Sequence, residues 1–266
     1  MAARGEDSGD GEPAAMTIAV TGSTVPDSAV PDSAVPDSQV PGSPVVGSTL
    51  SGSPATAPHV CPGLEPGAAA WLSTLLRQER WLMRALSAVA VSRLPDAWIG
   101  AGVIRDVVWG RAHAGFQPAE VRDIDVPYFD PLNLGKERDL TAQETLSALA
   151  DLPWEATNQA AVHTWYHDYF GGPPVAPLAS VHDAVATWPE TATCVAVRLM
   201  PDDSIEVCAP YGLSDLACGV WRVNPVRVTP ATSMARLARQ RVRDRWPRVR
   251  VMPPSGPGDA DVQAVI

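Results

Sequence analysis

The 266-residue sequence contains no run of 18 apolar residues, so no membrane-spanning helix and no membrane partner are expected. Its start lacks the basic segment followed by an apolar one that marks a secretory signal, and we therefore expect a cytoplasmic protein. Basic residues are also scarce. The 20 Lys and Arg face 30 Asp and Glu, and the net charge of -10 argues against a sequence-independent nucleic-acid coat protein.

Cysteine is rare as well, with four residues in the whole chain. None forms a C-x-x-C pair, and none stands beside a histidine at the spacing of zinc ligands. Cys194 and Cys208 lie inside apolar stretches, which favours ordinary reduced thiols in a core. What the chain does have is 45% hydrophobic residues, enough for one full-sized core or two small ones.

The first 65 residues have the composition of a disordered tail. Residues 25–43 repeat the unit VPDSA, and a proline at every fifth position excludes a helix. The first 60 residues hold seven acids and one base. We expect residues 253–266 to be disordered too, which leaves one domain at residues 66–252. The tail is interpreted as a solvated extension, with a recognition tail or spacer as the alternative.

Between the tails, helical and strand patterns are mixed without the regular alternation of a doubly wound sheet, which predicts an α+β fold. Three- and four-residue apolar spacing predicts one helix over 68–93. Shorter patterns predict strands at 97–99, 123–129 and 154–157, helices at 103–109, 136–150, 180–187 and 233–246, an edge strand at 248–251, and a hairpin of 194–199 with 205–208.

A pair of acids in the strand 123–129 is the first candidate for chemistry. Asp123 and Asp125 are two residues apart, so in a strand their side chains share one face, while Ile124 points to the core. Two neighbouring carboxylates repel each other unless a cation lies between them. Hard oxygen donors suit Mg²⁺, although a lone D-x-D also occurs by chance on loops.

A turn of small residues precedes this pair. Gly100, Ala101 and Gly102 join an apolar strand to a helix start, where backbone can approach a ligand and N–H groups favour phosphate. Arg105 follows three residues later and is a candidate phosphate clamp. The alternatives are a plain turn and a salt bridge of Arg105 near Asp106.

These motifs together resemble the nucleotidyltransferase superfamily typified by DNA polymerase beta. Residues 101–106 are similar to the G-G-x-V-R-D stretch of tRNA nucleotidyltransferases that add CCA. The segment from about 70 to 250 resembles an uncharacterised bacterial nucleotidyltransferase-like family still more closely. The shared blocks, in order, are residues 100–106, 123–130, 154–163, 188–193 and 209–216.

The resemblance implies a minimal nucleotidyltransferase fold, a mixed sheet flanked by helices, and a Mg²⁺ or Mn²⁺ cofactor. It also implies a third carboxylate on a neighbouring strand, for which Glu155 is the candidate and Asp130 and Asp151 are weaker rivals. The chain departs from the pattern in two places. Ala101 stands where the family has a glycine, and an inserted loop at 111–122 lengthens the path from the turn to Asp123.

Neutral polar residues after Glu155 add a possible pocket. Asn158, Gln159 and His163 are suited to hydrogen-bond a sugar, a base or an acceptor group, although a helix cap and a partly buried histidine are the alternatives. The arginines of residues 236–250 suggest a nucleic-acid backbone contact. We favour a solvated face that pairs with acidic surface.

The sequence therefore predicts a metal-dependent nucleotidyltransferase. It would move a nucleoside monophosphate from a nucleoside triphosphate to a hydroxyl on an unknown acceptor, which is a small molecule, a protein or RNA. The catalytic and metal-binding residues would be Asp123, Asp125 and Glu155. A non-catalytic nucleotide-binding or regulatory module with the same fold is the alternative, followed by an interaction protein whose D-x-D only pairs with arginines.

Overall fold

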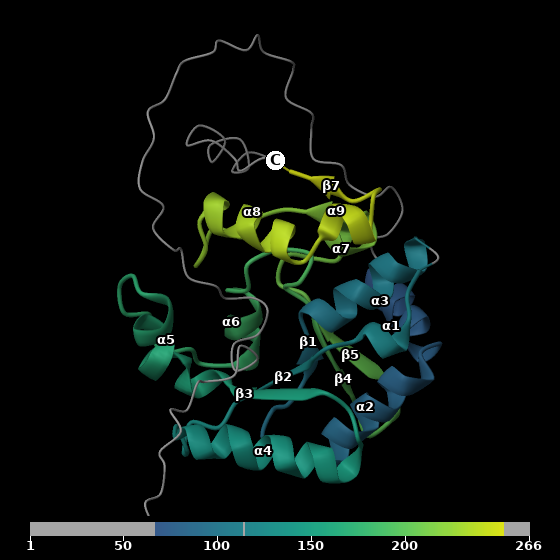
Figure 1. Cartoon of the computed structure of the whole chain (residues 1–266). Coiled ribbons are helices and arrows are strands. Elements are labelled where there is room, and N and C mark those ends of the chain that lie inside the picture. Colours follow the sequence, from purple (N-terminus) through teal and green to yellow (C-terminus); the bar gives the residue numbers. More distant parts are fainter. Residues whose placement is uncertain (1–66, 114, 253–266) are drawn as a thin grey trace, which may run out of the picture.

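The computed structural model describes residues 67–113 and 115–252 (Figure 1). The terminal segments expected to be disordered, 1–65 and 253–266, lie outside the described residues. The helices are α1 (Ala68–Arg77), α2 (Arg80–Val91), α3 (Gly102–Ala112), α4 (Lys136–Leu149), α5 (Val162–Phe170), α6 (Val181–Val185), α7 (Ser214–Ala217), α8 (Pro230–Arg239) and α9 (Val242–Arg245). Short 3-10 turns span Pro118–Glu120 and Gln159–Ala161. This mixture of helices and sheet confirms the predicted α+β class.

Five of the strands form the centre of the molecule. They are β1 (Ile99–Gly100), β2 (Ile124–Tyr128), β3 (Trp154–Asn158), β4 (Ala196–Leu199) and β5 (Ile205–Cys208). β2 and β3 run parallel, whereas β4 pairs antiparallel with both β1 and β5, as the hairpin pattern predicts. The N–H of Trp98 donates to the carbonyl of Pro127, and that of Phe129 to Pro95, which joins β2 to the β1 segment. β1, β4 and β5 form one three-stranded sheet and β2 and β3 form a second, and the two hydrogen bonds beside β1 bring these sheets together in the order β5-β4-β1-β2-β3.

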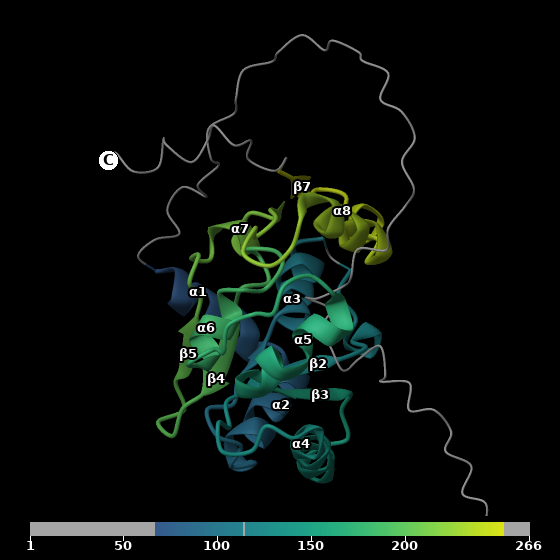
Figure 2. The same cartoon turned by 90° about the vertical axis from the view of Figure 1, so that its left-hand side faces the viewer.

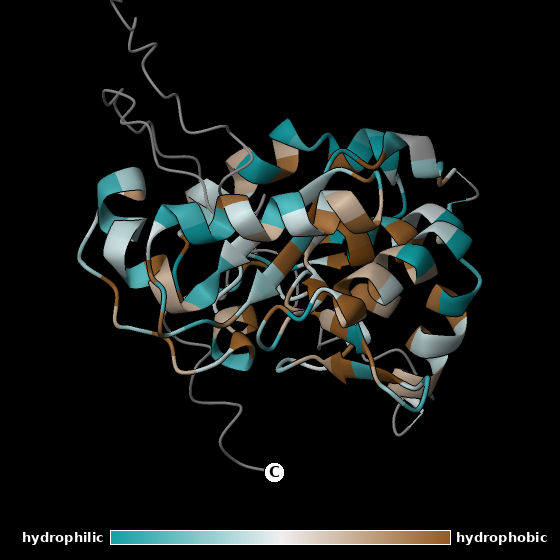
Figure 3. Cartoon of the chain, turned by 90° about the horizontal axis from the view of Figure 1, so that it is seen from below, coloured by the Kyte–Doolittle hydropathy of each residue, from teal (hydrophilic) through white to brown (hydrophobic). Residues whose placement is uncertain are grey.

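Alternation along these strands sorts the side chains onto two faces. Ile99, Ile124, Val126, Trp154 and Ala156 belong to the main core, which α1, α2, α3 and α4 also enter. The prediction that Ile124 points into the core is confirmed. Figure 3 shows apolar brown segments concentrated between the helices and teal segments around them.

A smaller apolar cluster contains the residues that alternate with those of the main core. It comprises Trp98, Ala101, Val181, Val185, Trp188, Cys194, Ala196 and Cys208. Trp98 and Ile99 are neighbours in the chain yet belong to different clusters, as the two-residue period of a strand requires. The sheet therefore has apolar material on both faces, and the acids of β2 and β3 share the face of the smaller cluster.

The helix expected over 68–93 is broken, and this part of the prediction is wrong. α1 ends at Arg77 and α2 starts at Arg80, because Glu79 between them has extended backbone with ψ of 91°. The buried Glu79 carboxylate accepts hydrogen bonds from Trp81 Nε1 at 3.1 Å and Arg111 Nε at 2.6 Å. Arg111 lies 32 residues further along the chain, so local periodicity carries no sign of this contact.

The basic helix expected over 233–246 is also interrupted. α8 and α9 are separated at Arg241, whose φ of 51° is left-handed. Helix α5 was not foreseen, and a short parallel pair of β6 (Val220–Trp221) and β7 (Arg250–Val251) adds to the C-terminal part. Figures 1 and 2 show α8 at one end of the molecule and α4 at the other.

A buried ion pair attaches α8 to the rest of the fold. Arg236 on α8 and Glu190 are 2% and 1% exposed, with Arg236 Nε 3.1 Å from Glu190 Oε1. The hydroxyl of Ser233 donates to the same oxygen at 3.2 Å, and Trp221 Nε1 donates to Ser233 at 3.0 Å. Burial raises the pKa of Glu190, and the charge of Arg236 acts against that rise.

The cysteines divide into two kinds. Cys194 and Cys208 are buried free thiols, as expected, and burial raises the pKa of Cys208 to about 11. Cys218, by contrast, is disulfide-bonded, so reduced core thiols do not describe all the cysteines of the chain. Among the helices of residues 67–113 and 115–252, none combines the length and apolarity needed to cross a membrane.

The Glu190–Arg236 pair yields a stability prediction. Glu190→Leu deprives a buried guanidinium of its carboxylate, and we expect a loss of about 3–5 kcal/mol in the free energy of unfolding. Adding Arg236→Met removes the stranded charge, so the double variant should recover most of that loss. Urea unfolding of the full chain measures both. A double variant less stable than Glu190→Leu alone would contradict the pairing.

Candidate nucleotidyl-transfer site

Two acids stand side by side on the parallel strands β2 and β3. Asp125 is the register partner of Glu155, and the two residues are 3% and 5% exposed. Register partners of adjacent strands project their side chains to the same face. Asp123 lies two residues before Asp125, directly ahead of the first residue of β2, and is partly exposed. The three predicted acids therefore start from one small region of backbone.

The face that these acids occupy follows from their neighbours. Ile124 and Val126 on β2, and Trp154 and Ala156 on β3, enter the main core. The alternating acids thus project to the opposite face, where the smaller cluster with Trp98 and Trp188 lies. They border apolar material, and a carboxylate in such surroundings gains from a nearby cation.

The other acids near this pair, including the rival candidates Asp130 and Asp151, are placed differently. Asp130 pairs with Arg138, with 2.8 Å between Oδ2 and Nε. Asp139 accepts a hydrogen bond from the Tyr128 hydroxyl at 2.6 Å and one from the Asn158 N–H at 2.7 Å, while burial raises its pKa. Asp151 is exposed on the connection from α4 to β3. Glu155 is thus the acid that shares the register position of Asp125.

In the described part of the chain, no three His, Cys, Asp or Glu side chains already form the arrangement of a metal site. The donor set nevertheless has the chemistry that Mg²⁺ and Mn²⁺ prefer, because carboxylate oxygens are hard ligands and two of the acids are adjacent and buried. By residue type and strand position, Asp123, Asp125 and Glu155 are the candidate ligands for such an ion.

The turn of small residues lies next to the acids. Trp98 and Pro127 are opposed in an antiparallel register, so continuing it two residues brings Gly100 opposite Asp125. A Cβ on Gly100 would approach within 2.7 Å of the Trp188 ring and 2.9 Å of the Val195 carbonyl oxygen. The absence of a side chain at Gly100 therefore permits β1 to pack closely against Trp188 and Val195. Trp188 is a site-supporting residue that the sequence did not single out.

Ala101 occupies a conformation that favours glycine. Its φ is 57° and its ψ is -126°, it is 2% exposed, and its N–H donates to Val195 at 3.0 Å. The methyl group belongs to the smaller apolar cluster, so the side chain is packed with Trp98 and Trp188. The turn thus keeps the glycine-type backbone with an alanine in place, at the cost of local strain.

Arg105 lies behind the turn, in a cage of aromatic rings. Its Nε and Nη2 are 2.9 and 2.7 Å from Asp106 Oδ1, and its Nη1 donates to Gln240 at 2.7 Å. The rings around the guanidinium, with centroids 5.2–5.9 Å from its carbon, are those of Trp109, Trp221 and Trp246. Arg105 is 2% exposed, although its Nη2 lies only 3.7 Å from where a Cβ of Gly102 would be. The salt bridge to Asp106 is one of the contacts of Arg105, and the hydrogen bond to Gln240 joins α3 to the C-terminal segment.

The three residues proposed for a pocket beyond β3 are placed differently from one another. Asn158 Oδ1 accepts from the N–H groups of Asp130 and Ala160, and its Nδ2 donates to the Asp130 carbonyl, so its amide organises the end of β3. Gln159 is buried and donates to the Thr157 carbonyl at 3.2 Å. His163, on the first turn of α5, has a buried Nδ1 without a hydrogen-bond partner among the described residues.

Comparison with known proteins points to one family. A family model described as nucleotidyltransferase matches residues 87–251. The NMR structure of a protein with a CCA-adding enzyme head domain is 27% identical to this chain, with a TM-score of 0.57. That alignment covers 68% of this chain and 94% of the other. No curated protein gives a significant match.

Two further structures are more distant. The Thermotoga maritima CCA-adding enzyme complexed with tRNA is 14% identical with a TM-score of 0.43, and the alignment covers 69% of this chain and 42% of that one. A CCA-adding enzyme complexed with CTP is 16% identical, also at 0.43, covering 68% and 43%. With TM-scores of 0.43, these two structures are too dissimilar to assign a substrate or a partner to this chain.

The two glycines of the turn give a matched pair of variants. Gly100→Ala should lower the free energy of unfolding by about 1–3 kcal/mol, because its methyl group meets a ring and a backbone oxygen. Gly102→Ala should change it by less than about 1 kcal/mol, because the nearest atom is an ordinary contact at 3.7 Å in the first turn of α3. Thermal and urea unfolding compare them. Equal effects would contradict the packing of Gly100.

The aromatic cage predicts that a lysine cannot replace Arg105. Arg105→Lys retains the charge but loses the planar contacts with Asp106, Gln240 and the rings, and we expect a loss of about 2 kcal/mol or more. Arg243→Lys, at an exposed position of α9, is the control and should stay within about 0.5 kcal/mol of the parent. An Arg105→Lys protein as stable as the control in urea would refute the cage.

Proposed function

The chain belongs to the nucleotidyltransferase family whose model matches residues 87–251, and from this premise we propose a specific reaction for it. It transfers a nucleoside monophosphate from a nucleoside triphosphate to the hydroxyl of an acceptor and releases pyrophosphate. Residues 66–252 form the catalytic unit, and the enzyme works in the cytoplasm. The acceptor is a small molecule, a protein or RNA.

The observation that carries this proposal is the in-register placement of Asp125 and Glu155 on β2 and β3, with Asp123 two residues away. These three acids would hold a Mg²⁺ or Mn²⁺ ion. When bound, such an ion neutralises phosphate charge and polarises the phosphoryl group. Asp130 and Asp139, by contrast, are bound to Arg138 and Tyr128.

The turn before α3 is suited to the triphosphate. The first N–H groups of an α-helix have no partner inside the helix, and the helix dipole is positive at that end. α3 begins at Gly102, so its open amide groups face the region of the turn, and Gly102 allows phosphate oxygens to come close to the backbone. Gly100 and Ala101 fix the path of the turn. Arg105, anchored to Asp106 close behind Gly102, adds positive charge.

The chemical step is an in-line displacement. The acceptor oxygen forms a bond to the α-phosphorus while the bond from that phosphorus to the bridging oxygen breaks, and pyrophosphate leaves. The proton of the acceptor hydroxyl passes to a carboxylate, for which Glu155 is our candidate. Asn158, Gln159 and His163, beyond Glu155 on the chain, are the proposed contacts for a sugar, a base or the acceptor.

Three conservative variants test the site. Asp123→Asn, Asp125→Asn and Glu155→Gln keep the side-chain volume and remove the negative charge. Each should reduce pyrophosphate release by more than the roughly 10–100-fold that mutations around a metal site cost. Removal of divalent metal with a chelator should abolish release in the parent, and Mg²⁺ or Mn²⁺ should restore it. The assay uses each of the four triphosphates with a panel of hydroxyl acceptors.

Asp151→Asn is the matched control, because Asp151 is an exposed acid on the same α4–β3–β2 segment. It should keep parental turnover. Melting temperatures of all four variants establish that they fold. Parental turnover in the three site variants would overturn the assignment. Binding of a triphosphate without pyrophosphate release from any acceptor would favour a non-catalytic module instead.

A further inference from the structure

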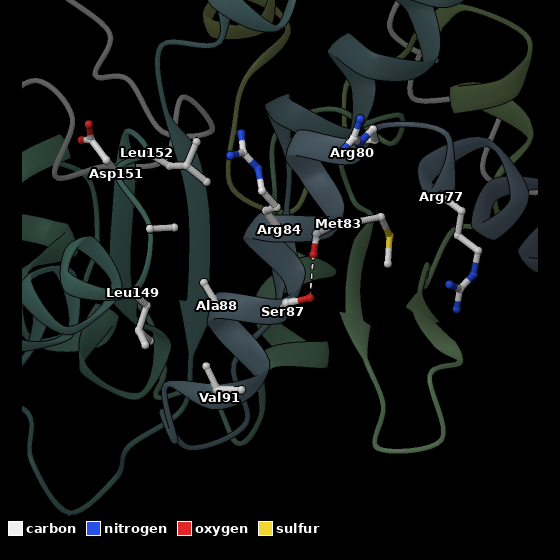
Figure 4. Close-up of a pocket in the computed structure, with 11 residues that line it drawn as sticks. Arg77, Arg80, Met83, Arg84, Ser87, Ala88, Val91, Leu149, Asp151 and Leu152 are labelled. Atoms are coloured by element: carbon white, nitrogen blue, oxygen red, sulfur yellow. Dashed lines mark hydrogen bonds between the residues drawn. The ribbon is translucent and has the colours of Figure 1, made fainter.

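A second concave surface lies away from the candidate site, between α2 and the connection from α4 to β3. It is a groove of about 920 Å³, with α2 side chains on one side and Leu149, Asp151 and Leu152 on the other (Figure 4). α2 packs on the main-core face of the sheet, whereas Asp125 and Glu155 alternate to the other face. The groove is therefore separate from the nucleotidyl-transfer site.

The rim of the groove is basic. Arg77, Arg80 and Arg84 come from α1 and α2, against the single acid Asp151. Arg77 pairs with Asp203 at 3.1 Å. Arg80 and Arg84 are exposed, and neither forms an ion pair with any residue in 67–113 or 115–252. Two guanidinium groups one helical turn apart are thus available to an acidic ligand.

The floor of the groove is apolar and remains exposed. Val91 is 62% exposed and Leu149 is 47% exposed, although both are large hydrophobic residues. Met83 and Leu152 are half-buried beside them. A ligand that combines carboxylates with small apolar side chains would match both the rim and the floor.

The N-terminal sequence of the same chain has this chemistry. Residues 25–43 alternate Val and Pro with acids, at Asp27, Asp32 and Asp37, and the first 60 residues hold seven acids and one base. We propose that this repeat binds the groove, with its aspartates on Arg80 and Arg84 and its valines and prolines on Val91 and Leu149. Because proline restricts the conformations of a free peptide, a proline-rich sequence in general loses less entropy on binding.

Chain length and the position of α1 allow this contact. The described chain starts at Gly67 and enters α1, whose last residue, Arg77, lines the groove. α1 has ten residues and is therefore about 15 Å long. The 23 residues from 44 to 66 separate the repeat from the described chain, and a random coil of that length spans about 25 Å on average. A tether of this size gives an effective concentration in the millimolar range, so a weak individual contact suffices.

Zero-length crosslinking in the full chain tests the contact. Carbodiimide joins carboxylates to amines, and Arg80→Lys with Arg84→Lys supplies amines while retaining charge. We expect crosslinks from these two positions to Asp27, Asp32 or Asp37, at least fivefold more abundant than from Arg243→Lys, an exposed control on α9. The excess should decline at high salt, which screens ion pairs. Equal yields at both places would overturn the proposal.

Isotope mixing identifies the occupant. In an equimolar mixture of ¹⁴N and ¹⁵N protein, crosslinks within one chain join only like-labelled peptides. Mixed pairs in statistical proportion would show that a second copy fills the groove, contrary to the proposal. Crosslinks confined to Glu6, Asp7 or Asp10 would also contradict it, because these acids lie outside the repeat.

Small-angle scattering provides an independent reading without new amines. Asp27→Asn, Asp32→Asn and Asp37→Asn combined should shift the radius of gyration of the full chain upward. Glu6→Gln, Asp7→Asn and Asp10→Asn combined remove the same charge from the same segment and should leave it at the parental value. The same radius in both triple variants would overturn the proposal. Pyrophosphate release is not involved, so its outcome is independent of the catalytic assignment.

Discussion

The central constraint on this structure is the placement of two carboxylates side by side on adjacent strands in apolar surroundings. Asp125 and Glu155 share a register position on β2 and β3, and both are almost fully buried. Neighbouring acids in such surroundings repel each other and are costly to keep charged. The two acids lie on the face of the sheet that carries the smaller apolar cluster, whereas Ile124, Val126 and Trp154 belong to the main core on the opposite face. This pair is the basis of the cation site proposed above.

The turn before α3 and the C-terminal segment are connected through Arg105. Its guanidinium bonds to Asp106 on α3 and to Gln240 after α8, within a cage of three tryptophans. Arg236 attaches α8 to Glu190 through a second buried pair. The short C-terminal helices thus depend on charged groups that each have a specific partner, and they support the region behind Gly102.

The sequence was sufficient for the parts of this fold that follow local rules. The two-residue period places Ile124 in the core, and the paired strand patterns at 194–199 and 205–208 predict the hairpin of β4 and β5. The placement of Glu155 as a neighbour of Asp125 came from family resemblance. The break at Glu79 could not be predicted from local sequence, because it involves a contact with Arg111. The surroundings of Arg105 could not be predicted either, because they include Trp221, Trp246 and Gln240, each more than 100 residues away. The nine residues of α5 carry four aromatic side chains and no clear apolar stripe, and this helix was missed.

The parallel pairing of β2 with β3 has a consequence for how this chain finds its fold. Sliding β3 by one residue would turn Glu155 into the main core and move Trp154 and Ala156 to the face of the smaller cluster. Glu155 therefore raises the free energy of any pairing of β2 and β3 that is out of register, independently of a role in catalysis. The side chain proposed for phosphate chemistry thus also favours the correct alignment of β2 and β3.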